Sequence, residues 1–119
     1  MKVAVTSPGS TLEAALDGRF GRAARFILFD TDDGSFSVLD NAQNLNAPQG
    51  AGIQSARNVA ASGASAVITG HTGPKAYAVL AKAGIGVYHS DAPTVREALD
   101  AFAAGNLAAA EGADVEGHW

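Results

Sequence analysis

The fold is decided by residues 66–88, whose sequence is AVITGHTGPKAYAVLAKAGIGVY. Ala66–Thr69 is a short apolar run that predicts a buried strand, and the glycine-rich turn after it ends that strand. Pro74 suits the first position of a helix, and Gly84 suits the end of one. The apolar run at 85–88 predicts another strand. A strand, a helix and a strand in this order predict parallel pairing with a right-handed crossover.

The rest of the chain supplies three strands and a helix before this unit, and a helix after it. The strands are expected at residues 2–6, 25–30 and 36–40, and the helices at 53–62 and 94–104. The Asp33-Gly34 pair favours a hairpin between the second and third strands. Thr94 and Glu97 have the spacing of a capping box at the last helix. The order β-β-β-α-β-α-β-α predicts an α/β domain with a mixed five-stranded sheet and helices on both faces.

Length and composition predict one domain. The chain has 119 residues, of which 47% are hydrophobic, so a packed core is expected. The domain is expected to span residues 1–107, followed by a weakly ordered tail at 108–119. Residues 41–52 are polar and predict a functional or mobile loop. The apolar run at the N-terminus is too short for a signal peptide or a membrane span, so a soluble cytoplasmic protein is expected.

Charge and cysteine content exclude several classes of function. The net charge is −4, from 8 basic and 12 acidic residues, and the only local cluster of cations is Arg19, Arg22 and Arg25. Nucleic acid is therefore a poor candidate partner. The sequence has no cysteine, which rules out disulfides, thiolate zinc sites and a cysteine-ligated iron–sulfur cluster within this chain.

Two histidines are expected where α/β proteins bind ligands, at the carboxyl ends of parallel strands. His71 follows the strand at 66–69, and His89 follows the strand at 85–88. Together they predict a site for a metal or a metal cofactor, and the alternative is a pair of solvated loop histidines. Because two imidazoles are too few for a closed zinc site, a third ligand would come from a carboxylate, from His118 or from the bound group itself.

Two further segments are candidates for ligand contact. Gly70–Gly73, which includes Thr72, opens a helix and could hold an anion on backbone N–H groups, although a tight turn is an equally simple explanation. Asp17–Ala23 could grip an anionic group through Arg19 and Arg22. The alternative for this loop is a structural turn, with Phe20 in the core and the arginines in solvent.

The usual catalytic constellations are missing, so the sequence predicts a protein that is not an enzyme. No Ser-His-acid set occurs in a nucleophile-elbow context. A two-metal nuclease would need acidic residues on its first strand, and residues 2–6 contain none.

The ordered set of motifs resembles the dinitrogenase iron–molybdenum cofactor biosynthesis family, the domain of NifX-type and NifB-type proteins. The resemblance runs from about Lys2 to Leu107. The motifs are Asp17–Ala23, Phe26, Asp30, Asn41, Gly50–Ile53, Val67–Gly70, Gly73–Ala76, Leu80, Ala83–Ile85, Val87-Tyr88 and Arg96–Leu99.

The resemblance implies a ribonuclease H-like fold and a non-catalytic binding or carrier role. The cargo would be an iron–molybdenum cofactor, an iron–sulfur cluster or a precursor, and the partner a nitrogenase-assembly protein. The residues predicted to bind the cargo come from the strand ends, the Gly70–Gly73 turn and the arginine loop: they are Arg19, Phe20, Arg22, Gly70, His71, Thr72, Gly73 and His89, with His71 and His89 as metal ligands. Nitrogenase-associated members often carry a histidine at the position of Arg19. Because arginine stays protonated, Arg19 would hold an anionic cluster electrostatically.

Two other functions stay open from the sequence. One is a regulatory or scaffold module that binds a protein partner or a small anion through the 41–52 loop and the arginine loop. The other is a hydrolase with minimal catalytic machinery.

Overall fold

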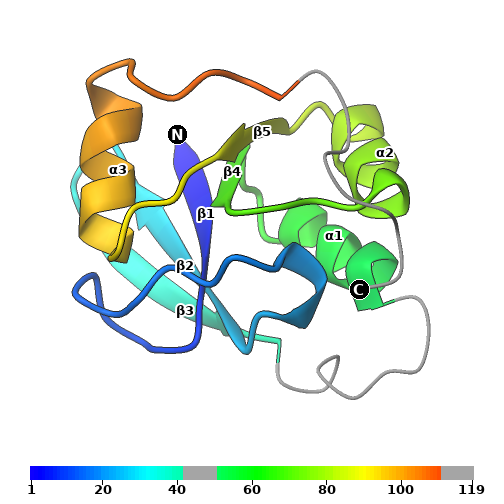
Figure 1. Cartoon of the computed structure of the whole chain (residues 1–119), viewed down its shortest axis with the longest axis horizontal. Coiled ribbons are helices and arrows are strands. Elements are labelled where there is room, and N and C mark those ends of the chain that lie inside the picture. Colours follow the sequence, from blue (N-terminus) through cyan, green and yellow to red (C-terminus); the bar gives the residue numbers. More distant parts are fainter. Residues whose placement is uncertain (42–50, 111–119) are drawn as a thin grey trace.

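The computed structural model describes residues 1–41 and 51–110, which form one mixed five-stranded sheet with helices on both faces (Figure 1). The elements are β1 (Lys2–Ser7), the 3₁₀ helix η1 (Phe20–Arg22), β2 (Arg25–Asp30), β3 (Phe36–Asp40), α1 (Ala51–Ala61), β4 (Ala66–Thr69), α2 (Pro74–Lys82), β5 (Gly86–His89) and α3 (Val95–Ala103). The predicted element order and mixed sheet are confirmed.

The strands lie in the order β3-β2-β1-β4-β5. The hairpin strand β2 is antiparallel to both β1 and β3, whereas β1, β4 and β5 are parallel to one another. The carboxyl ends of these three strands therefore meet at one edge of the sheet, which we call the carboxyl edge. The register pairs Val5 with Ile68 and Thr69 with His89.

Alternating side chains along the strands build two hydrophobic cores, one on each face. Val67 and Val87 point toward α1 and α2, where they pack with Leu80. Val5 and Ile68 point the other way and pack against α3. Figure 1 shows α3 on one side of the sheet and α1 and α2 on the other. None of the helices in the described residues is long and apolar enough to cross a membrane.

The helix boundaries follow the predicted signals. The hydroxyl of Thr94 accepts a hydrogen bond from the backbone N–H of Glu97 at 3.2 Å, which caps α3. Gly84 has a φ of +77°, a conformation that L side chains rarely adopt, and it ends α2.

The predicted position of the last strand was wrong by one residue. Ile85 belongs to the turn that caps the end of α2, because its N–H donates to the carbonyl of Leu80 at 2.9 Å. The strand therefore runs from Gly86 to His89. His89 is the last residue of β5 and not part of the following loop.

Residues 108–110, at the start of the predicted tail, lie along β5. Ala109 pairs with Tyr88 in an antiparallel bridge, and the N–H of Ala110 donates to the carbonyl of Val87 at 2.7 Å. The hydroxyl of Tyr77 also donates to the carbonyl of Ala110 at 3.0 Å. Residues 111–119 lie outside the described residues.

The first residue of the predicted 41–52 loop is hydrogen-bonded, and its last two residues belong to helix α1. Asn41 is fully buried, and its side-chain amide donates to the carbonyl of Ala23 and to the hydroxyl of Ser55. Helix α1 begins at Ala51. Residues 42–50, which carry most of this prediction, lie outside the described residues.

Candidate functional site

Three polar side chains lie in a row across the carboxyl edge, on the face that carries α1 and α2. Thr6, Thr69 and His89 end β1, β4 and β5 or lie one residue before the end. Both threonines are fully buried, and their hydroxyl oxygens are 2.9 Å apart. The row arises because the parallel register brings equivalent residues of neighbouring strands side by side.

The segment before η1 crosses this edge and is attached to β1. The hydroxyl of Thr6 lies 2.6 Å from the carbonyl oxygen of Asp17, and the N–H of Asp17 donates to the carbonyl of Thr6 at 2.8 Å. The hydroxyl of Ser7 donates to the carbonyl of Ala15 at 2.7 Å. Two side chains of one strand thus fix the path of a segment that has no regular structure of its own.

The same segment is also attached to the start of α3. The N–H of Arg96 donates to the carbonyl of Leu12 at 2.8 Å, and Ala15 pairs with Thr94 in an antiparallel bridge. The guanidinium of Arg96 binds the carboxylate of Glu13 through two nitrogens. The segment is therefore held between the sheet and α3.

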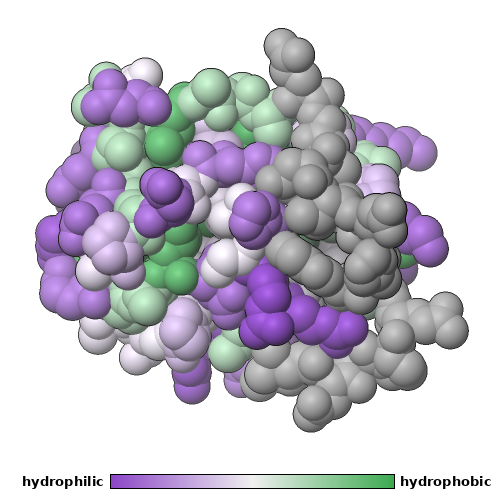
Figure 2. All heavy atoms as spheres, viewed as in Figure 1, coloured by the Kyte–Doolittle hydropathy of each residue, from purple (hydrophilic) through white to green (hydrophobic). Residues whose placement is uncertain are grey.

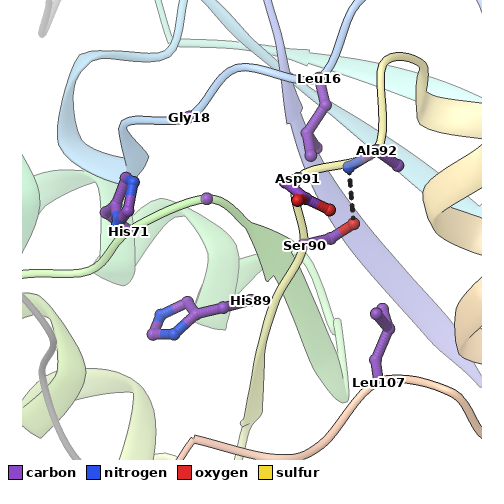
Figure 3. Close-up of a pocket in the computed structure, with 9 residues that line it drawn as sticks. Leu16, Gly18, His71, His89, Ser90, Asp91, Ala92 and Leu107 are labelled. Atoms are coloured by element: carbon purple, nitrogen blue, oxygen red, sulfur yellow. Dashed lines mark hydrogen bonds between the residues drawn. The ribbon is translucent and has the colours of Figure 1, made fainter.

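An open hollow of about 560 Å³ lies at the carboxyl edge (Figure 3). Its lining consists of Leu16, Gly18, Gly70, His71, His89, Ser90, Asp91, Ala92 and Leu107. Leucine and alanine side chains supply an apolar part, and imidazole, hydroxyl and carboxylate groups supply a polar part. In Figure 2, drawn from the direction of Figure 1, hydrophobic and hydrophilic residues meet on this face of the molecule.

Both predicted histidines contribute to this hollow. His71 is exposed and follows β4, whereas His89 is half-buried at the end of β5. Figure 3 shows the two imidazoles on one side of the hollow, with Asp91 and Leu107 on the other. Among residues 1–41 and 51–110, no group of three His, Cys, Asp or Glu side chains could hold a metal ion. A group bound here through imidazoles would have to bring further ligands of its own.

The residues of the arginine loop lie partly in the core and partly at the surface. Phe20 is fully buried, and its ring lies 5.5 Å from the ring of Phe26. Its predicted ligand contact therefore has no support in the geometry, whereas the alternative core position is the one observed. The side chain of Arg19 is 59% exposed, and the Arg19 backbone pairs with that of His71. Arg22 ends η1, and neither Arg19 nor Arg22 lines the hollow.

Gly70 lines the hollow as predicted, but Thr72 and Gly73 do not. Thr72 is fully buried, and its hydroxyl lies 3.1 Å from Nε2 of His89. Gly73 is the N-cap residue of α2, without a side-chain cap. Thr72 therefore contacts the lining residue His89 without lining the hollow itself, and Gly73 lies at the start of α2.

Ser90 and Asp91 line the hollow directly after the predicted His89, whereas Leu16, Ala92 and Leu107 were not predicted. Leu16 and Leu107 lie far apart in the sequence and come together only when α3 packs on the sheet. No local pattern marks them. The threonine pair could have been found from the sequence. Thr6 and Thr69 each follow a run of three apolar residues, in strands expected to be parallel.

A hollow at the carboxyl ends of parallel strands is the usual ligand position in open α/β sheets. The fold and the site thus define an α/β protein with a candidate ligand site at this edge. Residues 1–105 match the model of the family described as dinitrogenase iron-molybdenum cofactor. The chain belongs to this family, as its resemblance indicates.

Relatives of known structure share the fold over almost their whole length. The apo form of the orange protein from Desulfovibrio gigas is 38% identical, with a TM-score of 0.93, and the match covers 96% of each chain. A putative NifB protein from Thermotoga is 33% identical, with a TM-score of 0.80, and the match covers 91% of each chain. An uncharacterized protein of Methanocaldococcus jannaschii is 32% identical over 94 residues, which is 77% of this chain and 80% of that protein.

Proposed function

We propose that this protein binds and carries an iron–molybdenum cofactor, an iron–sulfur cluster or a precursor of either, without catalysing a reaction on it. The observation that carries the proposal is the hollow at the carboxyl edge, bordered by the imidazoles of His71 and His89. Imidazole nitrogens are common ligands of transition metals. The family of the chain supports the kind of cargo.

The residues of the hollow fit a preassembled cluster better than a bare cation. Two imidazoles cannot complete the coordination of a single metal ion. A cluster already holds its metals through bridging sulfides and needs only a few protein contacts. Gly18 leaves backbone exposed on the wall, and a Cβ atom there would meet nothing within 4 Å, so a bulky group can approach closely.

Arg19 is the proposed electrostatic contact at the rim. Its side chain is mostly exposed, and its backbone lies beside that of His71. A guanidinium at this place attracts an anionic cluster without being a ligand of the metal. Arg22 has the same proposed role, although neither arginine lines the hollow.

The comparisons support a binding role more than a catalytic one. The orange protein of Desulfovibrio gigas was solved in its apo form, that is, without its ligand, and the Thermotoga relative is named as a putative NifB protein. We further propose that the cluster passes to or from a nitrogenase-assembly protein in the cytoplasm. The ribonuclease H-like assignment of the fold is also a proposal, supported by the strand order with β2 antiparallel.

Anaerobic titration with isolated iron–molybdenum cofactor, followed by absorption and by size-exclusion chromatography, tests the proposal. We expect cofactor to comigrate with the protein, and His71→Ala and His89→Ala to weaken binding. Arg57→Ala, an exposed change on α1, is the control for loss of a surface side chain. Absence of binding at protein concentrations of about 100 μM, a weak-binding limit, would reject the carrier role.

One observation favours a scaffold role as a second candidate. Phe36 and Val38 are 42% and 41% exposed, and they lie on the same face of the outer strand β3, where they form an adjacent pair of large apolar side chains. They offer a surface for a protein partner. Recovery of a stable partner together with metal-free protein would favour this candidate over the carrier.

A further inference from the structure

The wall of the hollow formed by Leu16 and Gly18 has no regular secondary structure. Its shape depends on where the segment before η1 touches the carboxyl edge. Two of the contacts of this segment lie at or next to Gly18, one with β1 and one with the residue just after β4. Each involves a residue whose chemistry is hard to replace.

The first contact is the hydroxyl of Thr6. Its oxygen lies 2.6 Å from the carbonyl of Asp17 and 2.9 Å from the hydroxyl of Thr69. A hydroxyl has one proton, and a carbonyl can only accept, so Thr6 donates to Asp17 and is left to accept from Thr69. Because both threonines are fully buried, no water can replace either partner without opening the edge.

The second contact is a close approach of two backbones. A Cβ atom on Gly70 would lie 2.6 Å from Cα of Gly18 and 2.7 Å from its carbonyl oxygen. Both neighbours are main-chain atoms, which cannot rotate away as a side chain can. Any side chain at position 70 would therefore push the segment off the sheet edge.

Just beyond this contact, the segment is joined to the residue after Gly70. The N–H of Phe20 donates to the carbonyl of His71 at 3.2 Å, and the Arg19 backbone pairs with His71. A shift of the segment at Gly18 would pull on these bonds. The threonine anchor and the glycine contact thus act on the histidine that borders the hollow.

We propose that Thr6, supported by Thr69, and Gly70 are positioning residues that hold the wall of the hollow in its binding shape. Thr6 pulls the segment onto the edge, and the bare backbone of Gly70 leaves the room it needs. The effect on ligand affinity rests on the proposed function, whereas the effect on the wall itself does not.

Two unlike substitutions test the proposal through the same readout. Thr6→Val removes the anchor at nearly constant volume, and Gly70→Ala inserts a wedge. In amide hydrogen exchange followed by NMR, both should speed exchange of Asp17 and Phe20 by about tenfold or more, while the central strand residues keep their protection. Thr69→Val should have a smaller effect, because Thr6 keeps its bond to Asp17.

Matched controls separate positioning from general damage. Thr6→Ser keeps the hydroxyl and should restore slow exchange. Thr31→Val removes a hydroxyl that bonds to the carbonyl of Met1 at the far end of β1, and it should leave Asp17 and Phe20 protected. Gly18→Ala meets no atom within 4 Å, so it should not displace the segment, in contrast to Gly70→Ala.

Titration with isolated iron–molybdenum cofactor completes the test. Thr6→Val and Gly70→Ala should weaken binding at least about tenfold, and Thr6→Ser should not. If Thr6→Val does not fold, the affinity and amide exchange of Gly70→Ala and Thr69→Val test the proposal instead. Wild-type binding with unchanged affinity in the variants would overturn the role in binding, and unchanged exchange would overturn the role in shaping the wall. Should the wild type fail to bind, the proposed function falls and the exchange result alone judges the positioning role.

Discussion

The hydroxyl of Thr72 lies 3.1 Å from Nε2 of His89, although Thr72 lies in the turn before α2 and His89 is the last residue of β5. Thr72 is fully buried between β5 and the start of α2, so its position is fixed by packing. A buried partner of this kind sets the orientation of an imidazole and influences which nitrogen carries the proton. The pair links the predicted ligand His89 to the body of the fold.

Thr72→Val should therefore weaken binding of iron–molybdenum cofactor by about tenfold, because His89 loses the contact that orients it. Thr72→Ser keeps the hydroxyl and should bind like the wild type. The checks are anaerobic titration and the ¹⁵N chemical shifts of the His89 ring. Tighter binding by Thr72→Val would contradict the expectation and would mean that the hydroxyl competes with the metal for Nε2.

Replacing Arg19 should change binding in opposite directions depending on the new side chain. Arg19→Ala removes the cation of a residue whose backbone pairs with that of His71, and it should lower affinity for an anionic cluster, with a smaller loss at high salt. Arg19→His supplies an imidazole where nitrogenase-associated members often carry one, and it should raise affinity. Titration at two salt concentrations measures both effects, with Arg57→Ala as the matched arginine control. Equal affinities for all four proteins would remove Arg19 from the site.

The ion pair of Glu13 and Arg96 should contribute to stability only above acidic pH. Its hydrogen bond from Arg96 lowers the pKa of Glu13 below the ordinary value of 4.5. Because the folded pKa is lower than the unfolded one, the contribution is complete above the unfolded pKa and is lost as pH falls through the folded pKa. Both side chains are exposed, so the contribution is small.

Glu13→Gln should accordingly unfold at a slightly lower temperature than the wild type at neutral pH and at the same temperature near about pH 2. High salt should reduce the difference at neutral pH, since it screens an exposed pair. Thermal unfolding followed by circular dichroism is the measurement. A difference that persists at low pH would show that Glu13 acts through packing and not through its charge.

Asn41→Ala should destabilise the fold by about 1–3 kcal/mol, because it leaves buried polar partners without a hydrogen bond. The side chain of Asn41 joins three places, namely the carbonyl of Ala23, the hydroxyl of Ser55 and the amide of Asn58. Chemical denaturation measures the loss. Gln54→Ala removes an exposed amide from α1, the helix that carries Ser55 and Asn58. It is the control and should lower the free energy of unfolding far less. Similar losses in the two variants would argue against a buried network.

The sequence predicted the elements and the sheet because their signals are local. Apolar runs, the Asp33-Gly34 turn and the Thr94 cap each act within a few residues, and the parallel pairing follows from the strand–helix–strand unit. The last strand was misplaced at Ile85 because a buried apolar residue at a helix end looks like the start of a strand.

The site was only partly predictable because it is assembled from distant segments. His71 and His89 were found by the rule for strand ends, which needs topology alone. Arg19 and Phe20 are neighbours in one motif, yet one is exposed and the other is buried, and the sequence left both interpretations open. The wall residue Leu107 depends on how the chain returns after α3, which no short pattern records.

The contact of Ala109 and Ala110 with β5 gives the sheet two unlike margins. On one side the chain partly covers its own outer strand, whereas on the other side β3 has no neighbouring strand within the described residues. Among the described residues, β3 is therefore the edge that is more open to the addition of a strand from another chain. Two copies that paired through β3 would each cover the open edge of the other, which favours a pair of chains over a longer assembly along this route.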